Sequence, residues 1–359
     1  MDSIPVCEEL TYLRCIRASM RGIASAPGLL RELYRDVWEM LHTGYYKHVP
    51  MELRTQFRDI GNALAEKVDD FESKRFILDQ IGVLVGVFDE EPTVLDPSNE
   101  DKALSQSIAV PNEGLQPRVS VYPDVNNVAD FQDFFKYTEN RLPCIIKGGC
   151  KFWIACSIWK NVQFWYSFEH RFVPVEIGSY LSEDFEQKLV DLKDFAEYIF
   201  DPIRSQKYNR KMYLAQYELL DRFVSLADYM KPIPDAAHLL GIHQSQNLFI
   251  GPAGTVTPLH TDPYDNFFCQ VIGDKYILLH PPSELPNLYV RSATSQSKVT
   301  DLPHDLTEMI DWQKEYPAYR KAIGYEVHMH PGDCLFIPAG WFHFVKSHTP
   351  SISVAHFFE

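Results

Sequence analysis

Hydrophobic residues follow two different periods along this chain, one near its beginning and another toward its end. In the N-terminal part, Leu33, Val37 and Leu41 lie four positions apart, which places them on one face of a helix. Similar spacing recurs between about residues 8 and 88, so we predict an N-terminal α-helical region over residues 1–92. It contains no visible catalytic constellation, and we interpret it as a small helical bundle for packing or partner binding.

A polar stretch over residues 93–118 separates this region from the rest of the chain. Pro, Asn, Asp, Ser and Gln dominate it and periodicity fades, as is typical of a linker. From residue 119 to residue 359, short runs of alternating apolar and polar residues take over. Alternation of this kind is the pattern of strands with one buried face. We therefore predict three parts: a helical region, a linker and a strand-rich domain.

Most elements predicted in the domain 119–359 are strands that end at Gly or Pro. We predict strands over residues 119–122, 142–148, 172–178, 212–216, 247–250, 266–272, 275–279, 325–330, 334–337 and 351–358. Helices are predicted over residues 131–135 and 185–199. Gly273 and Asp274 stand between two strands and form a two-residue hairpin signal. The set predicts an α+β protein whose strands form a jelly-roll or cupin-like barrel.

Charge and cysteine content narrow the class of protein. A net charge of −15 argues against direct nucleic-acid binding and suits a partner with basic residues, although it is equally the charge of an ordinary acidic surface. The seven cysteines form no C-x2-C pair, which favours reduced thiols inside a cell. The first residues lack the pattern of a signal peptide, and no apolar run is long enough to cross a membrane. We expect an intracellular protein of the nucleus or cytoplasm.

Candidate metal ligands stand in two segments about eighty residues apart. His260 and Asp262 are two positions apart, so on a strand their side chains point to one side. Residues 331–343 form an aromatic-rich strand that ends on His343, with the Gly and Pro spacing of the second cupin motif. Two histidines and one carboxylate with the remaining positions open are the facial triad of non-haem Fe(II) oxygenases. The set does not exclude zinc, which prefers a tetrahedral site.

By these residues the chain, from about residue 138 onward, resembles the JmjC-domain Fe(II)/2-oxoglutarate oxygenases, and especially their small hydroxylase members. The segments that carry the resemblance are Val173 to Ser179, Tyr213 to Gln216, Pro258 to Pro263, Asn266-Phe267, Gly273 to Ile277 and the strand from Pro331 to His343. The resemblance implies a double-stranded β-helix. It also implies Fe(II) on His260, Asp262 and His343, with 2-oxoglutarate as cosubstrate and O2 as the oxidant.

The resemblance further implies which side chains hold 2-oxoglutarate. Its distal carboxylate needs a cation and hydrogen-bond donors when it is buried. Lys275 stands where the family has its cosubstrate lysine, and it is an unusual residue in the apolar run that follows it. By the same resemblance, Tyr213, Thr257 and Asn266 supply hydroxyl and amide contacts.

A protein or peptide substrate is expected, with arginine as the first choice. In the resembled subfamily the position of Glu176 pairs with a substrate guanidinium, although a glutamate on an edge strand in water would look the same. Phe249 stands where relatives carry a tryptophan beside the substrate, and Phe357 also replaces a tryptophan. Both departures keep an aromatic wall but weaken a cation–π contact. The sequence leaves these substrate assignments open.

Other functions remain open alternatives. An N-methyl-lysine demethylase would use the same oxidant, although no aromatic cage is visible. A cupin-like binding protein without turnover would be indicated by a degraded triad or a missing Lys275, and neither is seen. A cupin isomerase or zinc enzyme would have no use for that lysine.

Two further segments are interpreted as structural. A second metal site made of His328, His330, His348 and His356 is not favoured, because these residues have no matching Cys or His pair elsewhere. The acidic stretch 301–311 is interpreted as a solvated insertion between two barrel strands.

Overall fold

The structure, a computed structural model, describes Asn62 and residues 131–168, 171–178, 185–201, 203, 210–217, 219–231, 233–291 and 298–359. Apart from Asn62, the predicted helical region before residue 92, the linker and the strand 119–122 lie outside the described residues. The chain forms two compact units, one of which includes residues 163–197 and the other residues 96–162 and 198–359. We call the second one the barrel unit and treat each by itself.

The first unit contains an antiparallel strand pair, β2 (Phe172–Ile177) and β3 (Glu186–Asp191), flanked in sequence by α7 (Val162–Tyr166) and α8 (Leu192–Phe200). The prediction of one helix over 185–199 is therefore wrong in its first half. Alternate residues of β3 are buried, but two of these three, Gln187 and Asp191, are polar. The buried face of this strand therefore carries no apolar alternation in the sequence.

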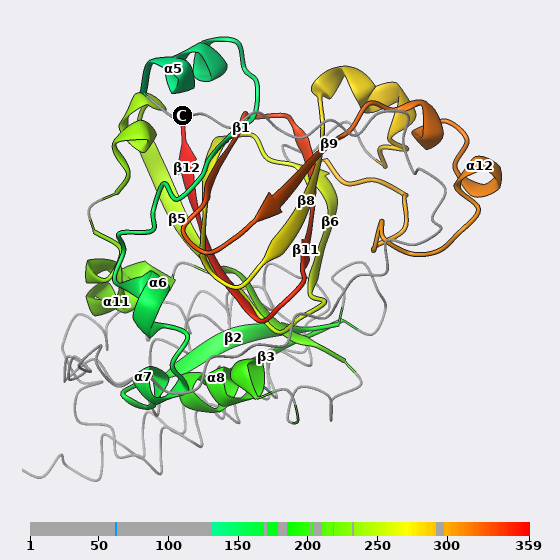
Figure 1. Ribbon diagram of the computed structural model, residues 1–359. Coiled ribbons are helices and arrows are strands. Elements are labelled where there is room, and N and C mark those ends of the chain that lie inside the picture. The colour runs from blue at the N-terminus through cyan, green and yellow to red at the C-terminus, as the bar shows by residue number, and fades with distance from the viewer. Residues whose placement is uncertain are drawn as a thin grey trace, which may run out of the picture. The chain divides into compact units, whose positions relative to one another are not determined.

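The barrel unit consists of two antiparallel sheets (Figure 1). In this unit the larger sheet contains, in spatial order, β1 (Cys144–Ile146), β10 (Cys334–Ile337), β7 (Asp265–Ile272), β12 (Ser351–Phe358), β5 (His243–Gly251) and β4 (Met212–Tyr217). The smaller sheet contains β6 (Val256–Thr261), β11 (Phe342–Ser347), β8 (Lys275–His280) and β9 (Tyr325–Met329), again in spatial order. The arrangement is that of a double-stranded β-helix, and the predicted fold class is confirmed.

Short helices surround these sheets. They are α5 (Phe131–Glu139), α6 (Ala155–Ile158), α10 (Leu219–Arg222), α11 (Val224–Asp228) and α12 (Trp312–Glu315), with 3-10 turns η2 (Asp235–Leu239), η3 (Pro282–Asn287) and η4 (Tyr319–Lys321). None of the described helices is long and apolar enough to span a membrane.

Two predicted strand connections differ from what the structure shows. The turn at Gly273 and Asp274 does not close a hairpin, because β7 belongs to the larger sheet and β8 to the smaller one. Residues 331–343 are likewise not one strand: β10 ends at Ile337 in the larger sheet, and His343 is the second residue of β11 in the smaller. Turn chemistry at Gly and Pro signals a reversal of the chain but not the sheet that the next strand joins.

The core between the sheets is apolar and takes residues from both of them. Its buried members are Ile145, Tyr213, Phe249, Phe268, Ile277, Leu279, Val327, Met329, Leu335, Ile337, Trp341, Val345, Ala355 and Phe357. Burying one large apolar side chain stabilises a fold by roughly 1.5–3 kcal/mol relative to exposure. This shared core holds the two sheets together, and therefore fixes the strands that carry the candidate ligands.

A second core covers the outer face of the smaller sheet. Leu278 and Phe344 of the sheet pack with Leu302, Leu306 and Trp312 from the segment between β8 and β9. The predicted solvated insertion over 301–311 is thus only partly solvated. Among its acidic residues it contains two buried leucines, Leu302 and Leu306, which pack it against the sheet.

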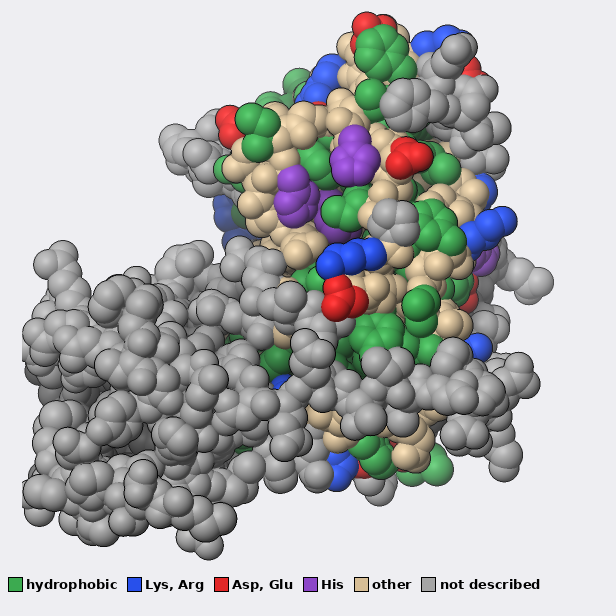
Figure 2. All heavy atoms as spheres, turned by 90° about the vertical axis from the view of Figure 1, so that its left-hand side faces the viewer, with side chains coloured by type: hydrophobic (Ala, Val, Ile, Leu, Met, Phe, Trp, Pro, Cys, Tyr) green, Lys and Arg blue, Asp and Glu red, His purple; other side chains and the backbone are tan. Residues whose placement is uncertain are grey.

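Histidine side chains gather on the described surface shown in Figure 2. His356 of β12 and His243 of β5 lie side by side, with Nδ1 and Nε2 3.4 Å apart. Among the described residues, no group of three or more metal-ligating side chains includes any histidine of the disfavoured second site.

Candidate active site

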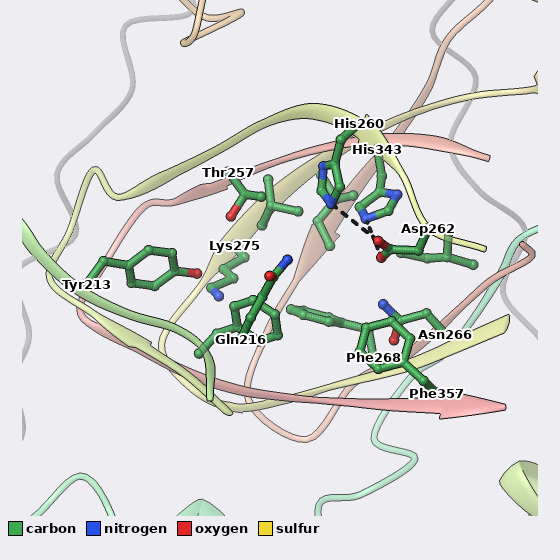
Figure 3. Close-up of a pocket in the computed structure, with 14 residues that line it drawn as sticks. Tyr213, Gln216, Thr257, His260, Asp262, Asn266, Phe268, Lys275, His343 and Phe357 are labelled. Carbon is green, nitrogen blue, oxygen red and sulfur yellow. Dashed lines mark ion pairs between the residues drawn. The ribbon is translucent and has the colours of Figure 1, made fainter. Parts of the chain in front are cut away.

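One pocket opens between the two sheets of the barrel unit (Figure 3). Its lining residues are Tyr213, Gln216, Phe249, Thr257, His260, Asp262, Asn266, Phe268, Lys275, Ile277, Ile337, His343, Val345 and Phe357. About 440 Å³ of space, partly open to solvent, is free of protein atoms there.

The three candidate metal ligands converge at one end of this pocket. His260 on β6 and His343 on β11 are directly opposed in the antiparallel register, so their rings lie on one face, with centroids 4.1 Å apart. Asp262 follows the end of β6, with its Oδ1 3.9 Å from His260 Nε2 and its Oδ2 3.5 Å from His343 Nε2. One donor atom from each residue lies within 4.8 Å of the other two.

The backbone fixes the proton position on both histidine rings. His260 Nδ1 lies 2.8 Å from the Pro258 carbonyl oxygen, and His343 Nδ1 lies 3.2 Å from the Trp341 carbonyl oxygen. A carbonyl oxygen can only accept, so each Nδ1 carries a hydrogen, and in the neutral ring Nε2 then keeps its lone pair. Both Nε2 atoms face Asp262 (Figure 3). Neutral imidazoles held in this way are prepared to bind a cation.

Charge states in the cluster suit a dication. Burial, aided by the field of His343, lowers the pKa of His260 to about 4, so its ring is neutral near pH 7. Burial opposes ionisation of Asp262, but the neighbouring His343 and His260 rings lower its pKa to about 2. The carboxylate is therefore charged. Two nitrogens, one anionic oxygen and an open side toward the pocket match the 2-His-1-carboxylate donor set of non-haem iron.

An ammonium stands alone deeper in the same pocket. Lys275, the first residue of β8, is only 2% exposed, and burial lowers its pKa to about 7. Its Nζ lies 5.4–6.0 Å from the ring centroids of Phe268, Phe249 and Tyr213. Within the described part of the chain no carboxylate pairs with it. Because a buried charge without a counterion is costly, this end of the pocket is built to receive an anion.

Polar groups also lie around the lysine and near the metal ligands. The Tyr213 hydroxyl points toward Lys275, and Thr257 lies above it on β6 (Figure 3). Asn266 on β7 is buried near Asp262, and its Oδ1 has no hydrogen-bond partner among the described residues. A buried amide oxygen left in this state needs a donor from a ligand or water. The pocket thus brings the predicted metal and cosubstrate residues together.

The two predicted substrate residues are placed differently. Phe249 on β5 lines the pocket at the Lys275 end, with its ring 6.2 Å from that of Phe268. Glu176 is half-buried on β2 of the first unit. Their contacts with a substrate stay predictions.

Gln216 lines the pocket although no role was predicted for it. Strict alternation along β4 would put Gln216 and Tyr213 on opposite faces. Gln216 has a positive φ of 51°, however, and the register of β4 against β5 shifts between Leu214 and Tyr217. This irregularity turns Gln216 toward the pocket. A φ above zero on a residue other than glycine leaves no signal in the sequence.

This chain is similar in sequence to known proteins of one family. The family model described as "Cupin-like domain" matches residues 130–359. Jumonji C domain-containing protein 5 of Drosophila melanogaster is 29% identical over 351 residues, which cover 90% of this chain and 84% of the relative. Lysine-specific demethylase 8 of Xenopus tropicalis is 30% identical over 61% of this chain and 48% of its own. The human bifunctional peptidase and (3S)-lysyl hydroxylase JMJD7 is 30% identical over 37% of this chain and 48% of its own.

The chain belongs to the cupin-like family. Within that family its relatives identify it as a JmjC oxygenase, which is a class of 2-oxoglutarate-dependent enzymes. It spans most of the Drosophila protein, but only about half of the demethylase and of the lysyl hydroxylase.

Proposed function

We propose that this chain is an Fe(II)- and 2-oxoglutarate-dependent dioxygenase that hydroxylates a protein side chain, with arginine as the first choice. The observation that carries the proposal is the lone buried ammonium of Lys275 in one pocket with His260, Asp262 and His343. A metal-binding protein without a dicarboxylate ligand would have no reason to bury an ammonium there without a counterion. A cupin isomerase or zinc enzyme leaves this lysine unexplained.

The donor set fits the iron. His260 and His343 would bind it through Nε2, and Asp262 through its carboxylate. Bound together, Fe(II) and 2-oxoglutarate supply the O2-dependent oxidation that inserts an oxygen atom into a C–H bond. The remaining positions around the ion would face the pocket, where Asn266 and Thr257 offer polar contacts.

The cosubstrate fits the rest of the pocket. Lys275 would pair with the distal carboxylate of 2-oxoglutarate, assisted by the Tyr213 hydroxyl. The surrounding rings of Phe249 and Phe268 exclude water, which strengthens such an ion pair. Asn266 Oδ1, buried without a partner among the described residues, marks a second polar contact that a ligand would complete.

A basic substrate is supported by charge. The chain carries a net charge of −15, which attracts cationic peptides by long-range steering. A carboxylate such as that of Glu176 can bind a guanidinium in bidentate fashion, whereas an ammonium gains less from that geometry. We therefore propose arginine in a protein or peptide, inside the nucleus or cytoplasm.

Demethylation of N-methyl-lysine is the second candidate. It is favoured by two relatives, of Xenopus tropicalis and Arabidopsis thaliana, that are named lysine-specific demethylases. The hydroxylase named among the relatives favours the first candidate. Both reactions need the same iron, cosubstrate and pocket, so the choice between them depends on the peptide.

Mass spectrometry of peptides separates the two reactions. The full chain is incubated with Fe(II), 2-oxoglutarate and ascorbate, together with either arginine peptides or N-methyl-lysine peptides. We expect one oxygen atom on arginine peptides and one succinate for each product. Loss of methyl groups from lysine, with no oxygen gained on arginine, would assign the chain to the demethylases.

Substitution of Glu176 tests the arginine assignment. Glu176→Gln should raise the KM for the peptide without changing the KM for 2-oxoglutarate. The control is Glu186→Gln, which removes a carboxylate from the paired strand β3. An equal effect of both substitutions would show that only general charge matters.

A further inference from the structure

Four cysteines from three separate segments of the sequence lie behind the wall of the pocket. Cys269 on β7 and Cys334 on β10 are directly opposed in the antiparallel register, with their sulfur atoms 3.5 Å apart. Asn266 and Phe268 of the same strand β7 line the pocket. Because neighbouring residues of a strand point to opposite faces, Cys269 points away from the pocket.

Cys150 completes a group of three. It lies in the turns after β1, and its sulfur and those of Cys269 and Cys334 all lie within 4.8 Å of one another. All three side chains are fully buried. The Cys150 thiol lies 3.9 Å from each of two backbone oxygens, those of Gln270 and Asp333, distances that allow only weak hydrogen bonds.

Cys156 brings a fourth thiol from the next short helix. It belongs to α6, which packs against β7, and it is half-buried. Its thiol donates toward the Cys150 carbonyl oxygen, with the sulfur 3.5 Å from that oxygen. The segment that carries Cys150 and Cys156 thus covers the sulfur atoms of the two strands.

The backbone leaves room for this approach at one glycine. A Cβ atom added to Gly149 would lie 3.0 Å from the Cys334 sulfur and 3.1 Å from Ile146 Cγ2. A side chain at this position would be tight, and the Cys334 sulfur or the turn would have to move by a few tenths of an ångström. The close approach of the turn to the Cys334 sulfur therefore depends on the absence of a side chain.

We propose that Cys150, Cys156, Cys269 and Cys334 bind one thiophilic metal ion, with zinc as the best candidate. Four thiolates around a tetrahedral Zn²⁺ form a closed structural site. At a Zn–S length of about 2.3 Å, neighbouring sulfurs of a tetrahedron lie roughly 3.8 Å apart. The sulfurs of Cys269 and Cys334 are 3.5 Å apart and that of Cys150 lies within 4.8 Å of both, so these three need little movement to bind the ion. Cys156 would move toward them to supply the fourth sulfur.

Binding involves no redox step. Each of the four thiols releases one proton to the solvent, and each resulting thiolate donates an electron pair to Zn²⁺. Zinc suits the buried sulfurs better than iron, because soft thiolates favour Zn²⁺ or Cu(I) while the nitrogen and oxygen ligands in the pocket also suit Fe(II). The two sites therefore differ in the ion that they select.

Co²⁺ provides the test, because cobalt bound to thiolates has a sulfur-to-cobalt charge-transfer band that histidine and aspartate ligands cannot produce. The chelator-treated full chain, kept reduced, is titrated with Co²⁺ and then with Zn²⁺. We expect the band in the parent, its loss in Cys269→Ser and in Cys334→Ser, and its displacement by Zn²⁺. Cys144→Ser is the matched control, since Cys144 is equally buried on β1 and lies outside the cluster, and it should keep the band.

A second measurement does not depend on the folding of any variant. Zinc should protect the four thiols of the parent from alkylation, which mass spectrometry of its peptides measures site by site. Absence of the charge-transfer band in the reduced parent, with alkylation unaffected by zinc, would overturn the proposal. So would a Cys269–Cys334 disulfide in the purified protein together with no cobalt binding after reduction.

Discussion

Strand β7 separates two regions that have opposite chemistry. On its inner face Asn266 and Phe268 line a pocket whose metal-ligating atoms are nitrogen and oxygen. On its outer face Cys269 belongs to a cluster of sulfur atoms. The pocket on the inner side opens to solvent at its mouth. On the outer side Cys150, Cys269 and Cys334 are fully buried. The inner face of β7 thus supports a site that is suited to catalysis. Its outer face supports a site that is suited to stabilising the fold.

The difference shows how donor type and access define what a cluster can do. Two neutral imidazoles and one carboxylate leave positions for other ligands, which a reaction needs. Four thiolates would saturate a tetrahedral ion and leave no position for a substrate. Proximity of three ligating atoms is common to both regions, so proximity alone does not distinguish them.

Removal of the carboxylate should have the largest effect. Asp262→Ala takes away the anionic ligand that would stabilise a dication held by the two imidazoles. We expect loss of 2-oxoglutarate turnover, measured as succinate formation, while the cobalt–thiolate band is retained. Asp301→Ala, which breaks an exposed ion pair with Arg291, is the control and should leave turnover unchanged. Turnover at the parent rate in the Asp262→Ala protein would rule out the triad as the iron site.

Replacement of Lys275 should weaken the cosubstrate. Lys275→Met removes the ammonium that would pair with the distal carboxylate, which costs roughly 2–5 kcal/mol when it strands a buried charge. This corresponds to about thirty-fold or more in the Kd for 2-oxoglutarate, measured by calorimetric titration without O2. Lys314→Met on the exposed side of α12 is the control. An unchanged Kd in the Lys275→Met protein would separate the lysine from 2-oxoglutarate.

The pH dependence of binding should report the same lysine. Burial lowers the pKa of Lys275 to about 7, below that of an unfolded lysine, so between these values the unfolded chain binds more protons and stability without ligand rises with pH. Binding has the opposite trend, because only the ammonium pairs with a carboxylate. The Kd for 2-oxoglutarate should be flat below pH 7 and rise about tenfold per pH unit above it. A parent with the same profile as Lys275→Met would contradict this assignment.

Zinc should raise the free energy of unfolding by a smaller amount than the effects above. The increase should depend only on the cysteine cluster on the outer face of β7. At a free zinc concentration of ten times Kd, a site that binds only the folded chain adds about 1.4 kcal/mol. For a domain of this size the Tm should rise by roughly 3–6 °C. Calorimetry of the Asp262→Ala protein isolates the effect from the pocket. The rise should disappear when Cys334→Ser is added and persist when Cys144→Ser is added instead.

The sequence predicts the pocket better than the outer face, for physical reasons. His260 on β6 and Asp262 just after its end lie two positions apart, so local geometry already brings them together. His343 can be recognised from sequence only through its match to a family motif. That it lies directly opposite His260 follows from the register of β11 against β6, which the sequence does not give. The cysteines stand at positions with no motif spacing, and only the pairing of β7 with β10 makes neighbours of Cys269 and Cys334.

Local irregularities of the strands could not be predicted from the sequence either. The positive φ of Gln216 reverses the expected face of a pocket residue. Gln187 and Asp191 are polar but buried on β3, so the alternation of apolar and polar residues that would predict a strand is missing there. In each case tertiary contacts decide the outcome against the local pattern, which is the usual limit of inference from periodicity.

The corner at Gly273 has a consequence for natural variation and for engineering. Its φ is +75°, and a Cβ atom there would overlap the Pro350 carbonyl oxygen and crowd the hydroxyls of Thr349 and Ser351. Position 273 is therefore closed to other residues unless the corner at 349–351 changes with it. A survey of tolerated substitutions should find the two turns varying as a pair. Insertions should be accepted in the long segment between β8 and β9 and rejected at this corner.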